Sequence, residues 1–325
     1  MIFPFLNGIL DFRRAPVTWL LVLMNLTVFV FSSGISGGTE KKFTEMIYED
    51  EFLITQGRLY AEFLASDDGR NLSGRSELVQ QLVAGAREGD NRRAKNLGYM
   101  ATRDQDFFVW MEMVELKGDQ VAVEIWREGW KELHQLKERH PSFLLGLGSE
   151  RMQLPQWISY MFAHGSMVHF LGNMLFLLIF GCMLEPLLGG LVLLLIYLAA
   201  GLGGGLLYVL VDGPSLSPLV GASGAISGLV GLFCVLYWSQ PVRYIYWLFL
   251  PVKGYLGFVY LPAWVVLFIW LVSDLAGIWS GVKELGGVAY TAHLGGQLVG
   301  LAFGLAILLL RRSFQVEGVQ SKLAR

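Results

Sequence analysis

Long apolar runs constrain this chain more than any other feature of its sequence. A helix needs about 20 apolar residues to cross a bilayer, and the run from Ala15 to Ser33 has nearly that length. Only 16% of the 325 residues are charged, against about 25% in an average soluble domain. Five further apolar runs follow in the second half of the chain, over 168–184, 188–211, 223–237, 255–272 and 293–310. The sequence therefore predicts an all-α, polytopic membrane protein with six transmembrane helices.

The first run is predicted to be a membrane anchor. Small residues follow it at Ser32, Ser33 and Gly34, as they would at the cleavage site of a signal peptide, but the run is long for a signal core. Cationic residues gather in cytoplasmic loops. With six spans, eight cations fall on one side: Arg13, Arg14, Arg243, Lys253, Arg311, Arg312, Lys322 and Arg325. The short opposite loops hold only Lys283. We expect a bacterial-type inner or plasma membrane, with both termini cytoplasmic.

A polar segment over residues 38–150 separates the first span from the others. The stretches "FTEMIYEDEFLITQGRLYAEFLA" and "DQVAVEIWREGWKELHQLKERH" repeat apolar residues at three- and four-residue spacing, which is typical of amphipathic helices. We therefore predict a soluble, mostly helical insertion on the outer face. His134 and His140 in its last helix are expected on a solvated face. The predicted domains are 1–37 (N-terminus and first helix), 38–150 (insertion), 151–312 (helices two to six) and 313–325 (cytoplasmic tail).

Charge and cysteine content exclude two classes of protein. The formal net charge of −2 argues against a nucleic-acid partner. The two cysteines, Cys182 and Cys234, lie in apolar runs, and a single pair cannot staple a chain of this length as a disulfide scaffold.

Polar residues recur inside the apolar runs, where they are costly and usually functional. Ser223 lies in "VGASGAISGLVG" and His293 in "AHLGGQLVG". His169 and Asn173 are four residues apart, so they share one helical face. The second, fourth and sixth helices are predicted to run from outside to inside, so these four residues can meet at one depth. The irregular stretch "VDGPSLSPLVG" before Ser223 indicates backbone that lines a cavity.

These residue types suit nucleophilic catalysis. A serine hydroxyl needs a neighbouring base, for which His293 is the candidate. A tetrahedral intermediate needs hydrogen-bond donors for its oxyanion, which Asn173, His169 and backbone N–H groups beside Ser223 can supply. Taken singly, each residue also suits a packing role, and His169 with Asn173 could form an interhelical clamp. A soluble-type nucleophile elbow is excluded, because Ala225 stands where that motif needs glycine.

Four glycines are expected to let helices approach closely around these residues. Gly221 and Gly224 flank the serine. Gly296 and Gly300 form a small-xxx-small pair, which would pack the sixth helix tightly against the fourth.

The motifs together resemble the rhomboid family of intramembrane serine proteases. The resemblance covers Arg13 to Ser33 and Leu154 to Arg312. It is carried by "GASG" at Ser223, "AHLGG" at His293, "HGSMVHFLGN" with His164, His169 and Asn173, and "FGCMLEP" with Gly181 and Glu185. It implies a six-helix core whose water-filled cavity opens outward, and a Ser–His dyad without an aspartate. Ser223 would be the nucleophile and His293 the general base. His169, Asn173 and the Ser223 backbone N–H would form the oxyanion site, and His164 matches a position at the membrane end.

Two sites, three residues in all, depart from the family pattern. Pro155 and Gln156 stand where many rhomboids carry a Trp-Arg pair, and Ser227 stands where many carry an aromatic residue that stacks on the histidine. The first change leaves open the shape of the loop before the second helix. The second leaves open how the His293 ring is held.

The predicted function is an intramembrane serine endopeptidase that cleaves within or near a substrate's transmembrane segment through an acyl-enzyme. Its partners would be transmembrane substrates and the bilayer, with no cofactor and no metal. One alternative is a pseudoprotease that holds client helices without cutting them. A transporter is disfavoured, because Glu185, Asp212 and Asp274 are expected near span ends. The insertion is expected to recruit or screen substrates or to dock a soluble partner, with the role of a spacer or a stability module as the alternative.

Overall fold

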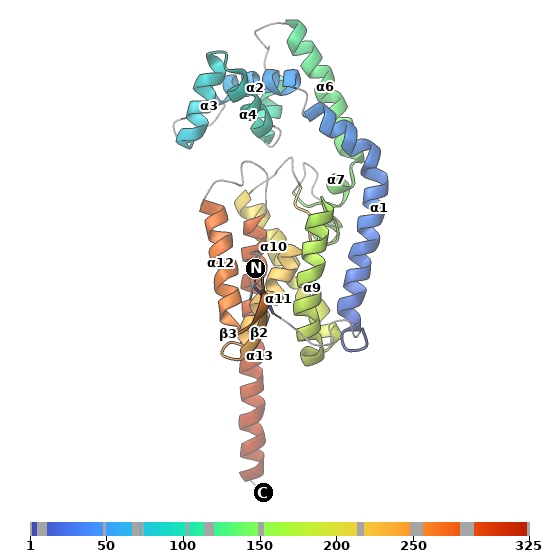
Figure 1. Cartoon of the computed structure of the whole chain (residues 1–325), viewed down its shortest axis with the longest axis vertical. Coiled ribbons are helices and arrows are strands. Elements are labelled where there is room, and N and C mark those ends of the chain that lie inside the picture. The colour runs from blue at the N-terminus through green and yellow to red at the C-terminus, as the bar shows by residue number, and fades with distance from the viewer. Residues whose placement is uncertain are drawn as a thin grey trace.

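The computed structural model describes residues 2–4, 12–47, 50–66, 72, 75–101, 104–113, 120–148, 153–212, 218–247, 256–279 and 289–323. This part of the chain is predominantly helical, as the sequence predicts. Figure 1 shows a bundle of helices with a smaller helical layer beyond one end of it. The C-terminal helix extends past the opposite end of the bundle.

Within the described residues, the bundle contains α1 (Pro16–Ile47), α9 (Met167–Leu188), α10 (Gly190–Asp212), α11 (Ser223–Leu236), α12 (Trp264–Trp279) and α13 (Tyr290–Leu323). Four of them contain a stretch long and apolar enough to cross a membrane, namely Pro16–Gly34, Met167–Leu188, Gly190–Val211 and Tyr290–Leu310. Two more are apolar but shorter, over Ser223–Leu236 and Trp264–Ile278. Each predicted span thus corresponds to an apolar helix. Four of these helices are also long enough to cross a membrane.

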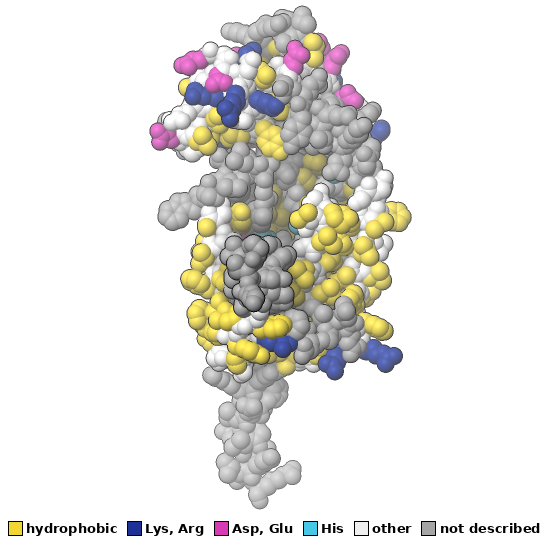
Figure 2. Space-filling model, viewed as in Figure 1, with side chains coloured by type: hydrophobic (Ala, Val, Ile, Leu, Met, Phe, Trp, Pro, Cys, Tyr) yellow, Lys and Arg dark blue, Asp and Glu magenta, His cyan; other side chains and the backbone are white. Residues whose placement is uncertain are grey.

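The surface of the bundle is apolar, as a lipid-facing surface must be. Figure 2 shows hydrophobic side chains over the middle of the molecule, whereas acidic side chains gather over the helical layer at the top and cations also lie along the lower rim. Exposed leucines on three different helices, Leu20, Leu191 and Leu309, are 53%, 70% and 63% exposed. By contrast, every residue of α11 from Gly224 to Cys234 is buried, so α11 is the central helix.

The start of α1 is anchored on the end of α9. The backbone N–H groups of Val17 and Thr18 donate to the two carboxylate oxygens of Glu185, at 2.8 and 2.7 Å, and the Thr18 hydroxyl donates to one of them at 2.7 Å. The first N–H groups of a helix lack partners within it, and a carboxylate there also suits the helix dipole. A Cβ on Gly181 would lie 2.6 Å from Thr18 Cγ2. Gly181 and Glu185 therefore dock α1 onto α9.

The prediction of an all-α chain is wrong at one place. The strands β1 (Ile2–Pro4), β2 (Pro241–Trp247) and β3 (Leu256–Pro262) form an antiparallel sheet in that order. The fifth helix, expected over 255–272, therefore begins only at Trp264. β2 and β3 are rich in aromatic and β-branched residues, which favour strands. An apolar run this short does not distinguish strand from helix.

The polar segment between α1 and α9 is helical, as predicted. It contains α2 (Asp50–Ala65), α3 (Glu77–Arg87), α4 (Asn91–Ala101), α5 (Gln105–Met113), α6 (Gln120–Arg139), α7 (Pro141–Leu145) and the short α8 (Gln156–Ser159). The predicted domain boundary at residue 38 falls inside α1, whose helix runs on to Ile47. Membrane span and insertion are therefore joined by one continuous helix.

The insertion has a hydrophobic core of its own, separate from that of the bundle. α2 and α4 cross closely, because a Cβ on Gly57 would overlap the carbonyl oxygen of Ala94 and one on Gly98 would overlap that of Leu53. The buried Gln56 donates to the Gly98 carbonyl at 2.7 Å. This core contains a group of aromatic side chains, Phe52, Tyr60, Phe63, Phe107, Trp110 and Trp126, among Leu, Val, Ala and Met residues.

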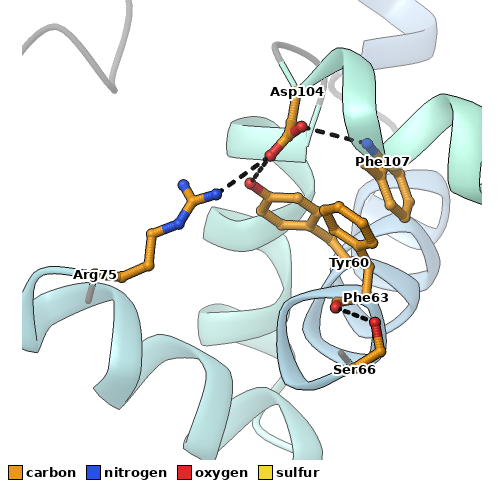
Figure 3. Close-up of polar contacts among 6 residues, drawn as sticks. All are labelled: Tyr60, Phe63, Ser66, Arg75, Asp104 and Phe107. Atoms are coloured by element: carbon orange, nitrogen blue, oxygen red, sulfur yellow. Dashed lines mark hydrogen bonds and ion pairs between the residues drawn. The ribbon is translucent and has the colours of Figure 1, made fainter. Parts of the chain in front are cut away.

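A polar network ties three segments of the insertion together at the edge of this core (Figure 3). The Tyr60 hydroxyl of α2 donates to Asp104 at 2.7 Å, and the guanidinium of Arg75 lies 3.7 Å from the same oxygen. The other Asp104 oxygen accepts from the backbone N–H of Phe107, in the first turn of α5, at 3.3 Å. Asp104 therefore links α2, the approach to α3 and the start of α5.

Candidate active site

Ser223 is the first residue of α11 and is half-buried. The non-helical backbone before it is held by hydrogen bonds from distant segments. Leu147 and Leu219 exchange backbone hydrogen bonds of 3.0 and 2.7 Å, and the N–H of Gly221 donates to the carbonyl of Tyr160 at 2.8 Å. These bonds satisfy backbone groups that a helix would otherwise pair, which allows irregular backbone inside a helical bundle. They also fix the residues that lead into Ser223.

The first turns of α11 and α13 touch through glycines. A Cβ on Gly296 would overlap the carbonyl oxygen of Gly224, and a Cβ on Gly300 would overlap that of Gly228. One on Gly224 would lie 3.4 Å from the carbonyl oxygen of Ala292. Ser223 precedes Gly224 in the chain and His293 follows Ala292, so this contact brings the serine and histidine backbones together. Gly296 and Gly300 therefore let α13 approach α11 closely.

His293 lies in the first turn of α13 and is 7% exposed. Its Nδ1 is 3.0 Å from Asp274 Oδ1, and Gln297 Nε2 donates to Asp274 Oδ2 at 2.7 Å. The rings of Trp270 and Tyr290 approach that of His293 edge-on, with centroids 6.4 Å away in both cases. The histidine is thus held by an aspartate, which the sequence analysis did not assign to the site.

Asp274 was expected near the end of a span, but it lies inside α12, because that helix begins and ends later than predicted. Sequence reasoning could have found two signals. One is a lone carboxylate within the apolar run "WVVLFIWLVSDLAGIW", and the other is a glutamine four residues after His293, on the same helical face.

His169 and Asn173 lie in the first two turns of α9 and face the backbone before Ser223. Gly221 has a φ of +123°, and a Cβ there would be 2.8 Å from His169 Nε2 and 3.6 Å from Asn173 Nδ2. Asn173 Nδ2 donates to the His169 carbonyl at 3.1 Å, which leaves the amide a second N–H. The structure therefore gathers the residues that the sequence singled out around the segment ending in Ser223.

Residues 151–310, which contain these site residues, match a family model described as a rhomboid domain. The chain belongs to the rhomboid family. It is 30% identical over 169 residues to "Rhomboid-like protease 5" of Toxoplasma gondii, covering 50% of this chain and 17% of that protein. It is 32% identical over 168 residues to "RHOMBOID-like protein 6, mitochondrial" of Arabidopsis thaliana, covering 51% and 47%. For "Rhomboid protein 1, mitochondrial" of Saccharomyces cerevisiae, the identity is 31% over 147 residues, covering 44% and 39%.

The chain thus spans less than half the length of each of these relatives. Family membership and the four long apolar helices make this rhomboid an integral membrane protein.

His164 of this rhomboid supports His169 by packing. The two rings meet edge-on with centroids 5.1 Å apart, and His164 also meets the ring of Phe170 at 5.5 Å. Its Nδ1 is 3.3 Å from the Phe162 carbonyl oxygen. Burial, and secondarily the charge of His169, lower the pKa of His164 to about 4. His164 is therefore a neutral imidazole at pH 7.

The two departures from the rhomboid pattern have local consequences. Gln156 ties α8 to α7, because its amide nitrogen donates to the Phe143 carbonyl at 3.2 Å while its oxygen accepts from the Gln153 N–H at 2.9 Å. Ser227 is fully buried, and its hydroxyl has no hydrogen-bond partner within the described residues. No aromatic ring is therefore supplied to His293 from this position of α11.

A cavity of about 370 Å³ opens beside His293 and Asp274. Its walls come from α9, the strands β2 and β3, α12 and α13, and they are mostly apolar: Phe176, Phe180, Tyr244, Leu261, Val265, Val266, Ile269, Trp270, Ser273 and Tyr290. Apolar walls with a few polar groups at one end are typical of a binding site.

Within the residues that the structure describes, no group of three or more His, Cys, Asp or Glu side chains could hold a metal ion. His140 caps α7, since its Nδ1 accepts from the Ser142 N–H at 3.2 Å. The side chain of His134 lies outside the described residues.

Proposed function

We propose that this rhomboid is an intramembrane serine endopeptidase, with Ser223 as nucleophile and His293 as general base. The observation that carries the proposal is the glycine contact between the first turns of α11 and α13, which brings the backbones of Ser223 and His293 close together. A cavity opens beside His293. One relative is named a protease, and the family is typically proteolytic.

The reaction would proceed in two halves. The Ser223 hydroxyl attacks the carbonyl carbon of the scissile peptide bond while His293 Nε2 takes its proton. The tetrahedral intermediate collapses to an acyl-enzyme, and the leaving amine takes the proton back from His293. Water then attacks the ester, again with His293 as base, and Ser223 is regenerated.

The oxyanion of the intermediate would be stabilised by donors around the Ser223 backbone. His169 Nε2 and the second N–H of the Asn173 amide face this segment, and the Ser223 N–H belongs to it. Such preorganised donors contribute about 10²–10³ each to the rate in a soluble serine protease. Gly221 allows the two side chains to come this close, because any larger residue would fill the space between them and the backbone.

The substrates would be transmembrane proteins that are cut within or near a membrane span, because the site belongs to a membrane-embedded helical bundle. For orientation, Arg13 and Arg14 precede α1 and Arg243 lies in β2. These cations favour placing that end of the bundle in the cytoplasm, and the insertion then faces outward.

Proteolysis of a panel of single-span substrates in liposomes tests the proposal. Ser223→Ala should lose several orders of magnitude in turnover, because serine and base act as one unit. Ser227→Ala is the matched control. It removes a second hydroxyl one helical turn along α11 and should keep wild-type turnover. Substantial cleavage by Ser223→Ala would refute the assignment. A wild-type protein that binds substrate helices without cutting them would favour the pseudoprotease alternative.

We further propose that the insertion recruits or screens substrates, or docks a soluble partner, and does no chemistry. It has its own core and joins the bundle at α1 and at Leu147, next to the Ser223 segment. A domain tethered there raises the local concentration of what it binds.

The test is a variant in which a Gly/Ser linker replaces residues 50–139, while α1, α7 and Leu147 are kept. Cleavage of a full-length client should fall, while that of a minimal transmembrane peptide should persist. Equal loss on both would indicate a structural role.

A further inference from the structure

We propose that Asp274 is a positioning residue for His293, and that Gln297 holds Asp274 in place. The site then works as a Ser223–His293–Asp274 triad in place of a dyad. This inference rests on the proposed peptide-bond cleavage and names the group that keeps its general base in working order.

The geometry comes from two helices. Asp274 of α12 directs one carboxylate oxygen to His293 Nδ1 at 3.0 Å and the other to Gln297 Nε2 at 2.7 Å. All three side chains are almost completely buried, with Asp274, Gln297 and His293 at 2%, 1% and 7% exposed. A buried carboxylate is costly unless it is paired and hydrogen-bonded, and here both oxygens accept hydrogen bonds.

The hydrogen bond decides which nitrogen of His293 carries the proton. A neutral imidazole has one donor and one acceptor nitrogen, and the partner of one nitrogen fixes the role of the other. Since a carboxylate only accepts, Nδ1 must be the donor toward Asp274. Nε2 is then the acceptor, which is the form that can take the Ser223 proton. When that proton arrives, the carboxylate also stabilises the positive charge on the ring.

Gln297 fixes the carboxylate itself. It lies four residues after His293 on α13, so both side chains leave the same helical face and meet Asp274 from one side. Its amide nitrogen can only donate, which matches the free oxygen of the carboxylate. Without it, Asp274 could rotate away from Nδ1 while staying buried.

The same arrangement accounts for the departure at position 227. The buried Ser227 offers no aromatic face to the histidine. Trp270 and Tyr290 approach the ring only edge-on, which limits its tilt but does not select a tautomer. The Asp274 hydrogen bond supplies both orientation and tautomer, so an aromatic residue on α11 is not needed to hold His293.

Two measurements on the full chain test the proposal. The first compares the kinetics of Asp274→Asn with those of wild type. The asparagine amide can donate to Nδ1, which forces the proton onto Nε2. In a soluble serine protease the corresponding change costs about 10⁴ in kcat. We expect a loss of about 10²–10⁴ in kcat, a KM within about twofold of wild type, and partial rescue by Asp274→Glu. Ser227→Ala is the control, because it removes a buried hydroxyl of α11 that has no hydrogen-bond partner within the described residues and does not line the cavity, so it should keep wild-type kcat.

The second measurement does not depend on activity. ¹⁵N-histidine NMR of the Ser223→Ala protein at mildly alkaline pH reports the tautomer of each of the five histidines, and His293→Ala assigns the relevant signal. We expect His293 to be protonated at Nδ1, and the proton to move to Nε2 when Asp274→Asn is added. If that variant does not fold, Gln297→Met replaces it, with an expected loss of about tenfold in kcat and mixed tautomers at His293.

The outcomes are separable. A wild-type protein without proteolytic activity would contradict the proposed function, while the NMR result would still decide the role of Asp274. An unchanged His293 tautomer, a kcat within about threefold of wild type, or a loss confined to KM would each overturn the proposal for Asp274.

Discussion

Gly221→Ala should damage this site through two separate effects. The first is on the backbone, because Gly221 has a φ of +123°, which L-amino acids rarely adopt. Residues held in such regions cost about 1–3 kcal/mol. The second is on His169, because the new Cβ would lie 2.7 Å from Cε1 and 2.8 Å from Nε2 of that ring. Carbon atoms prefer about 3.5–4.0 Å, so the ring must retreat by roughly 0.8–1.3 Å.

The two effects are measured by different assays. We expect the free energy of unfolding in detergent to fall by about 1–3 kcal/mol, from the backbone effect. We expect cleavage of a single-span substrate in liposomes to fall by about 100-fold, because a displacement of about 1 Å in a positioned group can cost that much.

Two glycines serve as matched controls. Gly189 has a φ of +85°, and a Cβ there would meet nothing within 4 Å, so Gly189→Ala should lose stability alone. Gly165 has open space and no positive φ, so Gly165→Ala should change neither quantity. The reasoning would be refuted if Gly221→Ala cleaved the substrate as fast as Gly189→Ala.

Three further predictions concern stability, its pH dependence and the need for a metal. Glu185→Ala leaves the N–H groups of Val17 and Thr18 at the start of α1 without their acceptor. At about 1–3 kcal/mol per buried donor, chemical denaturation should show a loss of roughly 2–6 kcal/mol in the free energy of unfolding. Unchanged stability would mean that water replaces the carboxylate. Because burial lowers the pKa of His164 to about 4 from an ordinary 6.5, the unfolded chain takes up the proton first. Stability should therefore be intact above about pH 6.5 and fall toward pH 4. His164→Phe should remove up to about 3 kcal/mol of that fall, and an identical pH profile in both proteins would contradict it. EDTA should leave cleavage unchanged, and a loss of activity that zinc restores would show that a metal is required.

Apolar periodicity and a few polar residues were enough to predict much of this protein. Lipid tolerates few spanning structures, so the long apolar runs were predicted to be helices, and the polar segment with helical spacing was predicted to fold outside them. Ser223, His169, Asn173 and His293 stood out because polar groups are rare in such runs. Their gathering around one backbone segment could be anticipated from the alternating direction of the helices.

Other features depend on contacts between segments that are distant in the chain. β2 and β3 pair with each other, and hydropathy does not register such pairing, so the start of α12 was placed too early. That error moved Asp274 to the edge of a span and hid its role. The contact between Asp274 and His293 joins residues 19 positions apart on two helices. Single-sequence periodicity reports which face of a helix is polar, but not which neighbouring helix meets that face. Only the packing of α12 against α13 decided that the histidine has an aspartate partner.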